Sequence, residues 1–571
     1  TFSVVQRRPL IGRLRALGVT RREIFRLVLG EAALIGVVGT GIGILLGIVL
    51  ATGLVQLITQ TINDLYFVLT VRELTIAPFT LAKGALLGLG TTLGAALAPA
   101  REATQAPVSV VLQRSATEAS TRKMIPRLAL GGVVLGGLGA ALLMIPSRSI
   151  IISYSALLGI IIAAALLTPA AIVAGARVLR PLLGRVVGVI GRMATRGVVT
   201  ALSRTSVAIA ALMIAIAATV GVGIMVDSFR GTVESWLNYS LQADVYVQPP
   251  SLVFRRSTST LEPALVDTLT STAGVGATYS VRRVDVQAEV GPTELVAIDP
   301  GPNTPDVYRF KSGDPEAIWP RFRSEDMAIV SEPYAYRYGL SVGDSLRLQT
   351  DRGERSFPIR GIFYDYASDL GVAVMSRTSY DRYYDDPGVS GIAVDAAEGQ
   401  DVDALIDRLR ARTQGMQEVF IRSNVGLREA SLRIFDRTFT ITAVLRLLAI
   451  IVAFIGVLSA LMALQLERSR ELAVLRANGM TPGQLGEYVT LQTGVMGLLA
   501  GLLAIPLGYA LAYVLIFVIN KRSFGWTLQL EVAPEILLQA VAIGLVAAVL
   551  AGLYPAWSMS QANPADALRE G

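Results

Sequence analysis

"RELAVLRANGMTPGQL", from Arg470 to Leu485, stands directly before a long apolar run near the end of the chain. Leu472 and Leu475 are one helical turn apart, so the first part of the stretch predicts a helix with both leucines on one side. We expect this helix to end at Gly479, because glycine readily takes the left-handed conformation that closes a helix. The stretch therefore predicts a helix that stops abruptly just outside a membrane.

The residues after the glycine predict that a second helix begins at once. Thr481 suits the N-cap, Pro482 the first helical position, and Gln484 the reciprocal contact of a capping box. Met480 and Leu485 have the spacing of a hydrophobic staple, which fixes the angle at which the chain enters the helix. A helix, a glycine stop and a capped helix together predict a rigid elbow.

A second copy of this elbow lies near the start of the chain, in "GRLRALGVTRREIF" (12–25). "RALGVTRREI" (15–24) aligns with "RANGMTPGQL" (476–485) without a gap, and the same register places Gly36 over Gly497. The first copy supplies each part again: Leu14 and Leu17, Gly18, Thr20 with Glu23, and Val19 with Ile24. Internal similarity of this kind indicates two related membrane units in one chain.

The composition around the elbows is that of an integral membrane protein. Of the 571 residues, 52% are hydrophobic and 17% are charged, whereas soluble proteins carry about a quarter charged residues. Runs of roughly 20 apolar residues, enough to cross a bilayer core of about 30 Å, recur along the chain. The expected spans are 27–58, 77–98, 128–146, 150–176, 204–226, 440–465, 488–519 and 534–557.

Basic residues in the loops predict the orientation of the spans. Segments 1–26, 99–127 and 177–204 hold seven, five and six Lys and Arg residues, and segments 59–76 and 147–149 hold one each. Cytoplasmic loops carry the excess of Lys and Arg, so the first three segments are expected on the cytoplasmic side. The chain between spans five and six then lies outside, and the C-terminus returns to the cytoplasm.

The outer segment, residues 227–439, predicts a mixed α/β domain of two lobes. "ADVYVQPP" (243–250), "YSVRRVDVQAEV" (279–290), "DSLRLQT" (344–350) and "RSFPIRGIFYDY" (355–366) have the composition of strands between turns. "EPALVDTLTS" (262–271) and "VDALIDRLRAR" (402–412) have the periodicity of amphipathic helices. About 210 residues are enough for such a segment to bury its own core.

Small residues predict where helices pack closely. Glycines four residues apart allow two membrane helices to approach each other. They are Gly39, Gly43 and Gly47 in the first span and Gly497 and Gly501 in the equivalent later span. Residues 191–206, with three arginines among apolar residues, predict an amphipathic helix at the cytoplasmic surface before span five.

Several functions are disfavoured by what the sequence lacks. It has no Cys and no His, which excludes thiol catalysis, disulfides and Cys/His metal sites. It has no G-x-x-x-x-G-K-[ST] phosphate loop, and its net charge of +7 reflects membrane orientation rather than nucleic-acid binding. We therefore expect no enzyme, no cofactor, no metal and no nucleic-acid partner. The acids of the outer segment are expected at the solvated surface, among them Asp285, Asp351, Asp365 and Asp369.

The elbows themselves allow two interpretations. Elbows join spans in many membrane proteins, and a charged first turn is usually just hydrated. However, two copies in the same register, each with an apolar face on the water side, indicate docking to a cytoplasmic protein.

The motifs resemble those of the FtsX-like permease family of ABC transporters, of the MacB and LolC/LolE type in its ten-span form. "ERSRELAVLRANGMT" (467–481) is similar throughout to the family motif before the third span of a unit, and "QRRPLIGRLRALGVT" (6–20) lacks its two acids. "PAWSMSQANPADALR" (555–569) and "PAREATQAPVSVVLQR" (99–114) resemble the family ending. "GLSVGDSLRL…FPIRGIF" (339–363) resembles the MacB-like periplasmic core domain. The resemblance also implies that the sequence begins inside its first unit.

The resemblance implies a polytopic α-helical membrane protein, built from two FtsX-like units, with a mixed α/β extracytoplasmic domain. Its expected layout is 1–114, part of the first unit; 115–190, a two-span hairpin; 191–226, an amphipathic helix and span; 227–439, the core domain; and 440–571, the second unit. The implied location is a bacterial cytoplasmic (inner) membrane, crossed several times.

The resemblance also implies that the elbows are coupling helices seated on a cytoplasmic ATPase dimer, which binds ATP-Mg in place of this chain. The implied coupling residues are Leu14, Arg15, Leu17, Gly18, Thr20, Glu23, Glu471, Leu472, Leu475, Arg476, Gly479 and Thr481. Glu31 belongs to a recurring family pattern, and the second copy has Gln492 there. The chain is then a permease subunit that contacts membrane lipids and, with a periplasmic partner, exports or extracts lipoprotein, lipid or peptide. Peptide-antibiotic sensing and mechanical activation of a cell-wall hydrolase are the alternatives.

Overall fold

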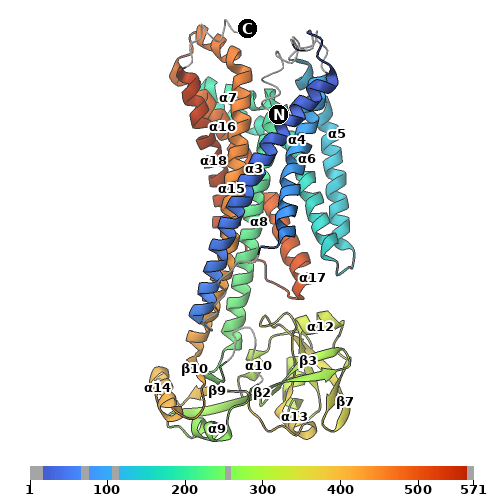
Figure 1. Cartoon of the computed structure of the whole chain (residues 1–571). Coiled ribbons are helices and arrows are strands. Elements are labelled where there is room, and N and C mark those ends of the chain that lie inside the picture. Colours follow the sequence, from blue (N-terminus) through green and yellow to red (C-terminus); the bar gives the residue numbers. More distant parts are fainter. Residues whose placement is uncertain (1–13, 15–16, 66–75, 106–114, 251–258, 562–571) are drawn as a thin grey trace.

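A computed structural model describes residue 14 and residues 17–65, 76–105, 115–250 and 259–561. In parts of the long helices, residues 459–473 among them, it describes the backbone alone. The chain forms a bundle of long helices above a smaller α/β domain, with the starts of α3 and α16 at the end of the bundle farthest from that domain (Figure 1).

The bundle consists of long apolar helices, most of them longer than a bilayer requires. Seven of them are long and apolar enough to span a membrane within the part of the chain whose side chains are described. The eighth expected span, 440–465, lies inside a continuous helix, but most of its side chains are outside the described set. The helices are α3 (Arg21–Leu65), α4 (Pro78–Gln105), α5 (Ser115–Met144), α6 (Ile150–Val186), α7 (Gly188–Thr200), α8 (Leu202–Ser240), α15 (Asn424–Ala477), α16 (Pro482–Tyr513), a π-helix (Val514–Asn520), α17 (Lys521–Phe524) and α18 (Pro534–Gln561).

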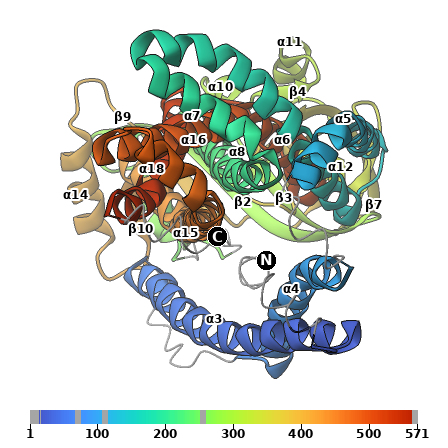
Figure 2. The same ribbon diagram turned by 90° about the horizontal axis from the view of Figure 1, so that it is seen from above.

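The main packed core of the bundle lies where α8, α16 and α18 meet. Its fully buried members include Ile216 of α8, Ala500 of α16 and Ala548 of α18. α5 and α6 form the expected hairpin beside it, and α3 and α4 form a separate pair at one side of the bundle (Figure 2).

Two of the five predicted packing glycines lie in a close helix contact. A Cβ built on Gly497 would lie 2.3 Å from the carbonyl oxygen of Gly544, and one built on Gly501 would lie 2.9 Å from Cα of Val541. Only glycine permits this approach of α16 to α18, which confirms the prediction for the second unit.

For Gly39, Gly43 and Gly47 no described atom lies within 4 Å of a built Cβ, and α3 also contacts α15, most of whose side chains lie outside the described set, so their packing role stays a prediction. α3 meets α4 through Gly36, whose Cβ would lie 3.3 Å from Thr92, and through Thr40, which packs on Gly88. The four-residue spacing of the glycines identifies one face of α3. It does not predict which turns of that face contact α4.

α7 differs from the amphipathic helix expected over 191–206. It begins at Gly188 and ends at Thr200, and α8 begins at Leu202 after a break at Ala201. Its small residues Gly191, Ala194 and Gly197 are buried, and Ala194 packs with Leu485 and Val489 of α16. The apolar face therefore packs on protein instead of lying in the membrane surface, because its small side chains permit close helix contact.

The outer domain is built on one mixed sheet, of ten strands within the described residues. The strands follow the order β10-β1-β9-β2-β3-β8-β5-β7-β4, and β6 pairs with β2 and β7. β3–β8 and β5–β7 are parallel, and the other pairs are antiparallel. The strands are β1 (Val245–Gln248), β2 (Val275–Ala288), β3 (Gly291–Ile298), β4 (Phe310–Ser312), β5 (Ala328–Ser331), β6 (Ser345–Thr350), β7 (Gly353–Phe363), β8 (Ala373–Ser376), β9 (Gly391–Ala396) and β10 (Phe420–Ser423).

All four predicted strand segments and both predicted helices of this domain are confirmed. In β6, Leu346 and Leu348 are buried while Ser345, Arg347 and Gln349 are exposed, which is the alternation expected of a strand with one covered face. The short helices are α9 (Pro263–Thr270), α10 (Thr304–Val307), α11 (Pro315–Ile318), η2 (Trp319–Arg321), α12 (Glu332–Tyr338), α13 (Arg377–Tyr383) and α14 (Val402–Thr413).

Separate cores divide the domain into the two expected lobes. In one lobe, Leu265 of α9 and Leu405 of α14 pack on β1, β9 and β10. In the other lobe, Phe357 of β7 packs under α12 and α13 on one face of the sheet, and Phe322 and Val374 form the core of the opposite face.

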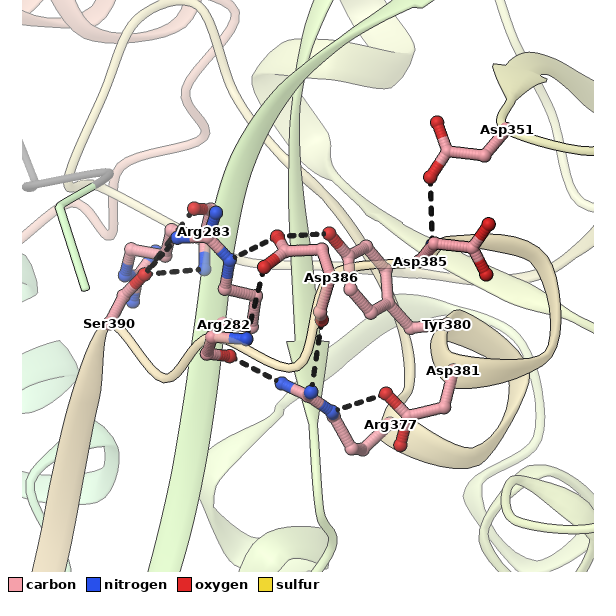
Figure 3. Close-up of polar contacts among 10 residues, drawn as sticks. Arg282, Arg283, Asp351, Arg377, Tyr380, Asp381, Asp385, Asp386 and Ser390 are labelled. Atoms are coloured by element: carbon pink, nitrogen blue, oxygen red, sulfur yellow. Dashed lines mark hydrogen bonds and ion pairs between the residues drawn. The ribbon is translucent and has the colours of Figure 1, made fainter. Parts of the chain in front are cut away.

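A polar network joins β2 to the loop before β9 (Figure 3). Arg282 is 9% exposed; its Nε donates to Asp386 Oδ2 (2.6 Å) and its Nη1 to Ser390 Oγ (3.0 Å). Burial by itself would raise the pKa of Asp386, but hydrogen bonds from Arg282, Gly388 N–H and Tyr380 outweigh it and leave that pKa lowered. The ionised carboxylate therefore stabilises the fold of this loop.

One of the four surface acids was placed wrongly by the sequence. Asp285, Asp351 and Asp369 are exposed as expected, but Asp365 is only 5% exposed. Its Oδ1 accepts the Ala367 N–H (3.2 Å), and its Oδ2 has no hydrogen-bond partner among the described residues. Asp365 follows the buried end of β7, and that position carries it inside.

α8 and α15 continue beyond the membrane and reach the outer domain directly. The expected domain began at 227 and ended at 439, whereas α8 runs on to Ser240 and α15 already begins at Asn424. β1 follows α8 and β10 precedes α15, and these strands pair antiparallel, with Val245 opposite Ser423. The edge of the sheet therefore holds α8 and α15 together, and we call these two the stalk helices.

Candidate coupling elbows and outer junction

The two elbows have the same backbone geometry. Gly18 and Gly479 both have φ of 98°, in the region that favours glycine. Beyond each glycine an N–H bonds to the carbonyl five residues back: Val19 to Leu14 (3.0 Å) and Met480 to Leu475 (3.1 Å). This six-to-one bond is that of a Schellman stop. It confirms the predicted end of the helix before Gly479, whereas the helix expected before Gly18 falls on residues largely outside the described ones.

Both capping boxes are present. Thr20 N–H donates to Glu23 Oε2 (2.8 Å), and Glu23 N–H donates to Thr20 Oγ1 (3.4 Å). Thr481 N–H donates to Gln484 Oε1 (3.0 Å), and Gln484 N–H donates to Thr481 Oγ1 (3.3 Å). Caps of this kind contribute about 1 kcal/mol each to a helix start, so the start of each elbow's second helix is fixed by its own residues.

The hydrophobic staples are confirmed as well. Ile24 is 2% exposed and packs with Val19, and Leu485 is 1% exposed and packs with Met480. The second elbow has a further contact, because Leu485 also packs on Ala194 of α7. α7 therefore braces the second elbow from the side.

The apolar groups that face water agree with the prediction at Leu17 but differ from it at the second elbow. Leu475 is only partly exposed and belongs to the cluster with Leu485 and α7, so it contributes to internal packing. Leu17 is 82% exposed, and Val474, which the sequence motif did not single out, is 44% exposed. Among the described elbow residues, Leu17 and Val474 are therefore the exposed large apolar side chains.

The remaining predicted coupling residues are less informative. Arg15 and the side chains of Glu471 and Leu472 lie outside the described residues. Arg476 is half-buried, and so is Glu31. Gln492, the counterpart of Glu31, is 6% exposed and lies beside Gly197 of α7. The structure does not test a coupling role for any of them.

Comparison with known proteins identifies the family of this chain. The profile of the FtsX-like permease C-terminal domain matches residues 1–108 and 443–564, and that of the MacB-like periplasmic core domain matches 205–412. An uncharacterized ABC transporter permease protein of Mycobacterium tuberculosis, Rv0987, is 42% identical over 574 residues, which are 100% of this chain and 67% of the relative. The chain belongs to the FtsX-like permease family of ABC transporters.

Two further relatives cover parts of this FtsX-like permease. The macrolide export ATP-binding/permease protein MacB of Chromobacterium violaceum is 26% identical over 126 residues, 22% of this chain and 19% of the relative. The crystal structure of the periplasmic region of MacB from Actinobacillus actinomycetemcomitans aligns with 34% of this chain. The match covers 94% of the MacB region, with 13% sequence identity and a TM-score of 0.25. The chain spans about two thirds or less of the curated relatives it matches.

The outer ends of the permease helices are tied to the outer domain through the loop between α17 and α18, residues 525–533, which we call the outer junction. The main contact of this loop with the outer domain is made by Glu332 of α12, whose side chain is 3% exposed. Glu332 accepts hydrogen bonds from the N–H (3.0 Å) and hydroxyl (2.5 Å) of Thr527 and pairs with Lys311. Tyr366 donates to the Thr527 carbonyl (2.7 Å).

The same loop also runs along the stalk helix α8. Ser228 Oγ accepts the Glu531 N–H (3.0 Å), and Thr232 Oγ1 accepts the Gln529 N–H (3.1 Å). Phe229 of α8 stacks on Trp526 of the loop, with ring centroids 5.6 Å apart. One loop thus joins the second unit, the stalk and the outer domain.

A second connection comes from the hairpin of α5 and α6. Arg148, between these helices, donates to the carbonyl oxygens of Tyr336 and Arg337 of α12, both at 2.9 Å. Arg522 of α17 donates to the carbonyls of Leu143 (3.0 Å) and Ile145 (2.8 Å). Arg148, which the sequence marked only as a lone outer arginine, therefore anchors the outer domain to the hairpin.

Proposed function

We propose that this permease converts ATP binding by a cytoplasmic ATPase dimer into movement of its outer domain. The observation that carries the proposal is the continuity of α15. This single helix of 54 residues, about 80 Å long at 1.5 Å per residue, starts at the sheet of the outer domain and ends at the second elbow. A displacement of the elbow would therefore be passed along one rigid element.

The elbows support the choice of partner. Leu17 and Val474 are apolar side chains exposed next to rigid, capped helix starts, and such side chains suit grooves of a cytoplasmic protein. The family implies that this partner is the ATPase, which would carry the nucleotide. The proposed location is the bacterial inner membrane, with the outer domain on its extracytoplasmic side.

The outer domain supports work on an amphipathic cargo. A cavity of about 410 Å³ lies between the lower end of α8, the sheet and the start of α15. It is lined by aromatic rings, Trp236, Tyr279 and Phe420 among them, and by the buried carboxylate of Asp365. Aromatic faces beside charged groups such as Arg283, Asp395 and Arg422 suit amphipathic segments of lipoprotein, lipid or peptide, so we propose export or extraction of such a substrate.

The test uses the complete permease co-purified with its ATPase. Leu17→Asp and Val474→Asp are expected to abolish stimulation of ATP hydrolysis by the permease, because a carboxylate cannot enter an apolar groove without losing its hydration. Leu370→Asp is the matched control, since Leu370 is an exposed leucine (57%) of the outer domain. Normal stimulation in both elbow variants would refute the coupling role.

A further inference from the structure

A pocket lies at the end of the bundle opposite the outer domain, between α5, α6 and α7. Its volume is about 390 Å³. Arg177 and Arg180 of α6 and Arg196 of α7 line it, together with apolar side chains that include Ile125, Val173 and Val199. None of the elbow residues contributes to it.

Helix geometry explains why three arginines meet here. Val173, Arg177 and Arg180 are three and four residues apart on α6, so they share one face of that helix. α7 turns back at Gly188, whose φ is 69°, and packs tightly on α6: a Cβ on Gly191 would lie 2.5 Å from the Leu183 carbonyl oxygen. This turn brings Arg196 to the same pocket.

The charge in the pocket is not compensated by the described residues. None of the residues that line it is acidic, and within the described chain no hydrogen bond or ion pair is found for Arg177, Arg180 or Arg196. Three guanidinium groups around one space repel one another and together attract an anion. Arginine forms paired hydrogen bonds to phosphate oxygens, which fits a phosphate group best.

The depth of the pocket points to the source of the phosphate. Arg177 lies about 40 Å along α6 from Ile150, at 1.5 Å per residue. A bilayer measures about 40–45 Å with its headgroups, so if Ile150 is placed at the outer headgroup surface, Arg177 and Arg180 lie at the level of the opposite headgroups. Val173 and Ile125 then face the adjoining hydrocarbon.

We propose that this pocket binds the phosphate headgroup of an anionic phospholipid, with the acyl chains along Ile125 and Val173. The three arginines would hold the phosphate and the apolar wall would hold the first methylenes. The opposite contact of α7, Ala194 on Leu485, reaches the second elbow, so the bound lipid would brace that elbow against the membrane.

Native mass spectrometry of the complete permease tests the proposal, with dioleoyl phosphatidylglycerol and dioleoyl phosphatidylcholine as probes. We expect the wild type to prefer phosphatidylglycerol. A hydrogen bond to a charged group strengthens binding about tenfold or more, so the loss of two arginines that contact the phosphate in R177Q/R180Q is expected to weaken binding of phosphatidylglycerol about 100-fold. R127Q/R185Q removes two exposed arginines at the same end of the bundle that do not line the pocket, and it is expected to bind like the wild type.

Three results would overturn the proposal. They are equal losses in R177Q/R180Q and R127Q/R185Q, equal affinity for the two lipids, and displacement of the lipid by millimolar inorganic phosphate, which would assign the site to a soluble anion. R177K/R180K separates charge from folding: it keeps both charges and is expected to recover most of the binding. Equal thermal unfolding midpoints of the variants show that any loss is one of lipid binding.

Discussion

Replacing Glu332 is expected to detach the outer junction from the outer domain. Glu332 accepts two hydrogen bonds from Thr527 and pairs with Lys311, and its side chain is 3% exposed. In Glu332→Ala the Thr527 N–H and hydroxyl lose a charged acceptor, which costs about 1.5–3 kcal/mol for each hydrogen bond before water replaces part of it. Lys311 is partly exposed and regains hydration, so it adds little.

We therefore expect about 2–3 kcal/mol less free energy to hold the loop on the domain. At 1.4 kcal/mol for each factor of ten, this is a roughly 30- to 150-fold loss of amide exchange protection at Thr527. Hydrogen–deuterium exchange of peptides that cover residues 521–533 measures this loss of protection directly. Glu332→Gln keeps the shape and one acceptor, and it is expected to lose about a third as much free energy.

Glu354→Ala is the matched control, because Glu354 is an exposed glutamate on β7 of the same domain. Its protection at Thr527 should equal that of the wild type. If Glu332→Ala changed protection at Thr527 by less than about threefold, the junction would not be held as these contacts indicate. In the complex with the ATPase, the same variant should also lose any ATP-dependent change of exchange in the outer domain.

Three further outcomes follow from the same contacts. Gly479→Ala is expected to destabilise the second elbow by about 1–2 kcal/mol through backbone strain alone, since no described atom lies within 4 Å of the added carbon; a thermal midpoint equal to that of the wild type would contradict it. Gly501→Leu should force α16 from α18 and lower the thermal midpoint and yield of folded permease. Gly43→Leu, with no described atom within 4 Å of the added carbon, should leave both unchanged. Because the folded pKa of Asp386 is lowered, its stabilisation is complete above the unfolded pKa and is lost as pH falls below about 4; protection of residues 384–390 should drop there in the wild type and less so in Arg282→Gln.

The elbows show which features a sequence can settle by itself. The positive φ of Gly18 and Gly479, the capping boxes of Thr20 and Thr481, and the staples were all predicted and are all present. These contacts join residues no more than about six positions apart, so the local chain determines them without the rest of the fold. The strands of the outer domain were predictable for the same reason, because apolar and polar residues alternate along their sequence with a period of two.

The burial and packing of a side chain depend instead on which other helix lies against it in the folded protein. Leu475 was expected to face a partner, but α7 packs against its cluster, and Val474 is exposed instead. Gly43 has the spacing of a packing residue but no neighbour among the described atoms, while Gly501 packs on Val541. A helix face can be read from periodicity, but its neighbour is chosen by segments that lie hundreds of residues away.

By itself the sequence determined that this chain crosses a membrane, that it repeats a capped elbow, and that it carries an α/β domain outside. Only the tertiary structure decided that hydrogen bonds between Glu332 and Thr527 hold the domain against the membrane helices, and that Asp365 is buried. It alone also decided that three arginines from two helices share one pocket. The reason is physical: backbone conformation and hydropathy are properties of neighbouring residues, whereas burial and charge pairing arise only when distant segments meet.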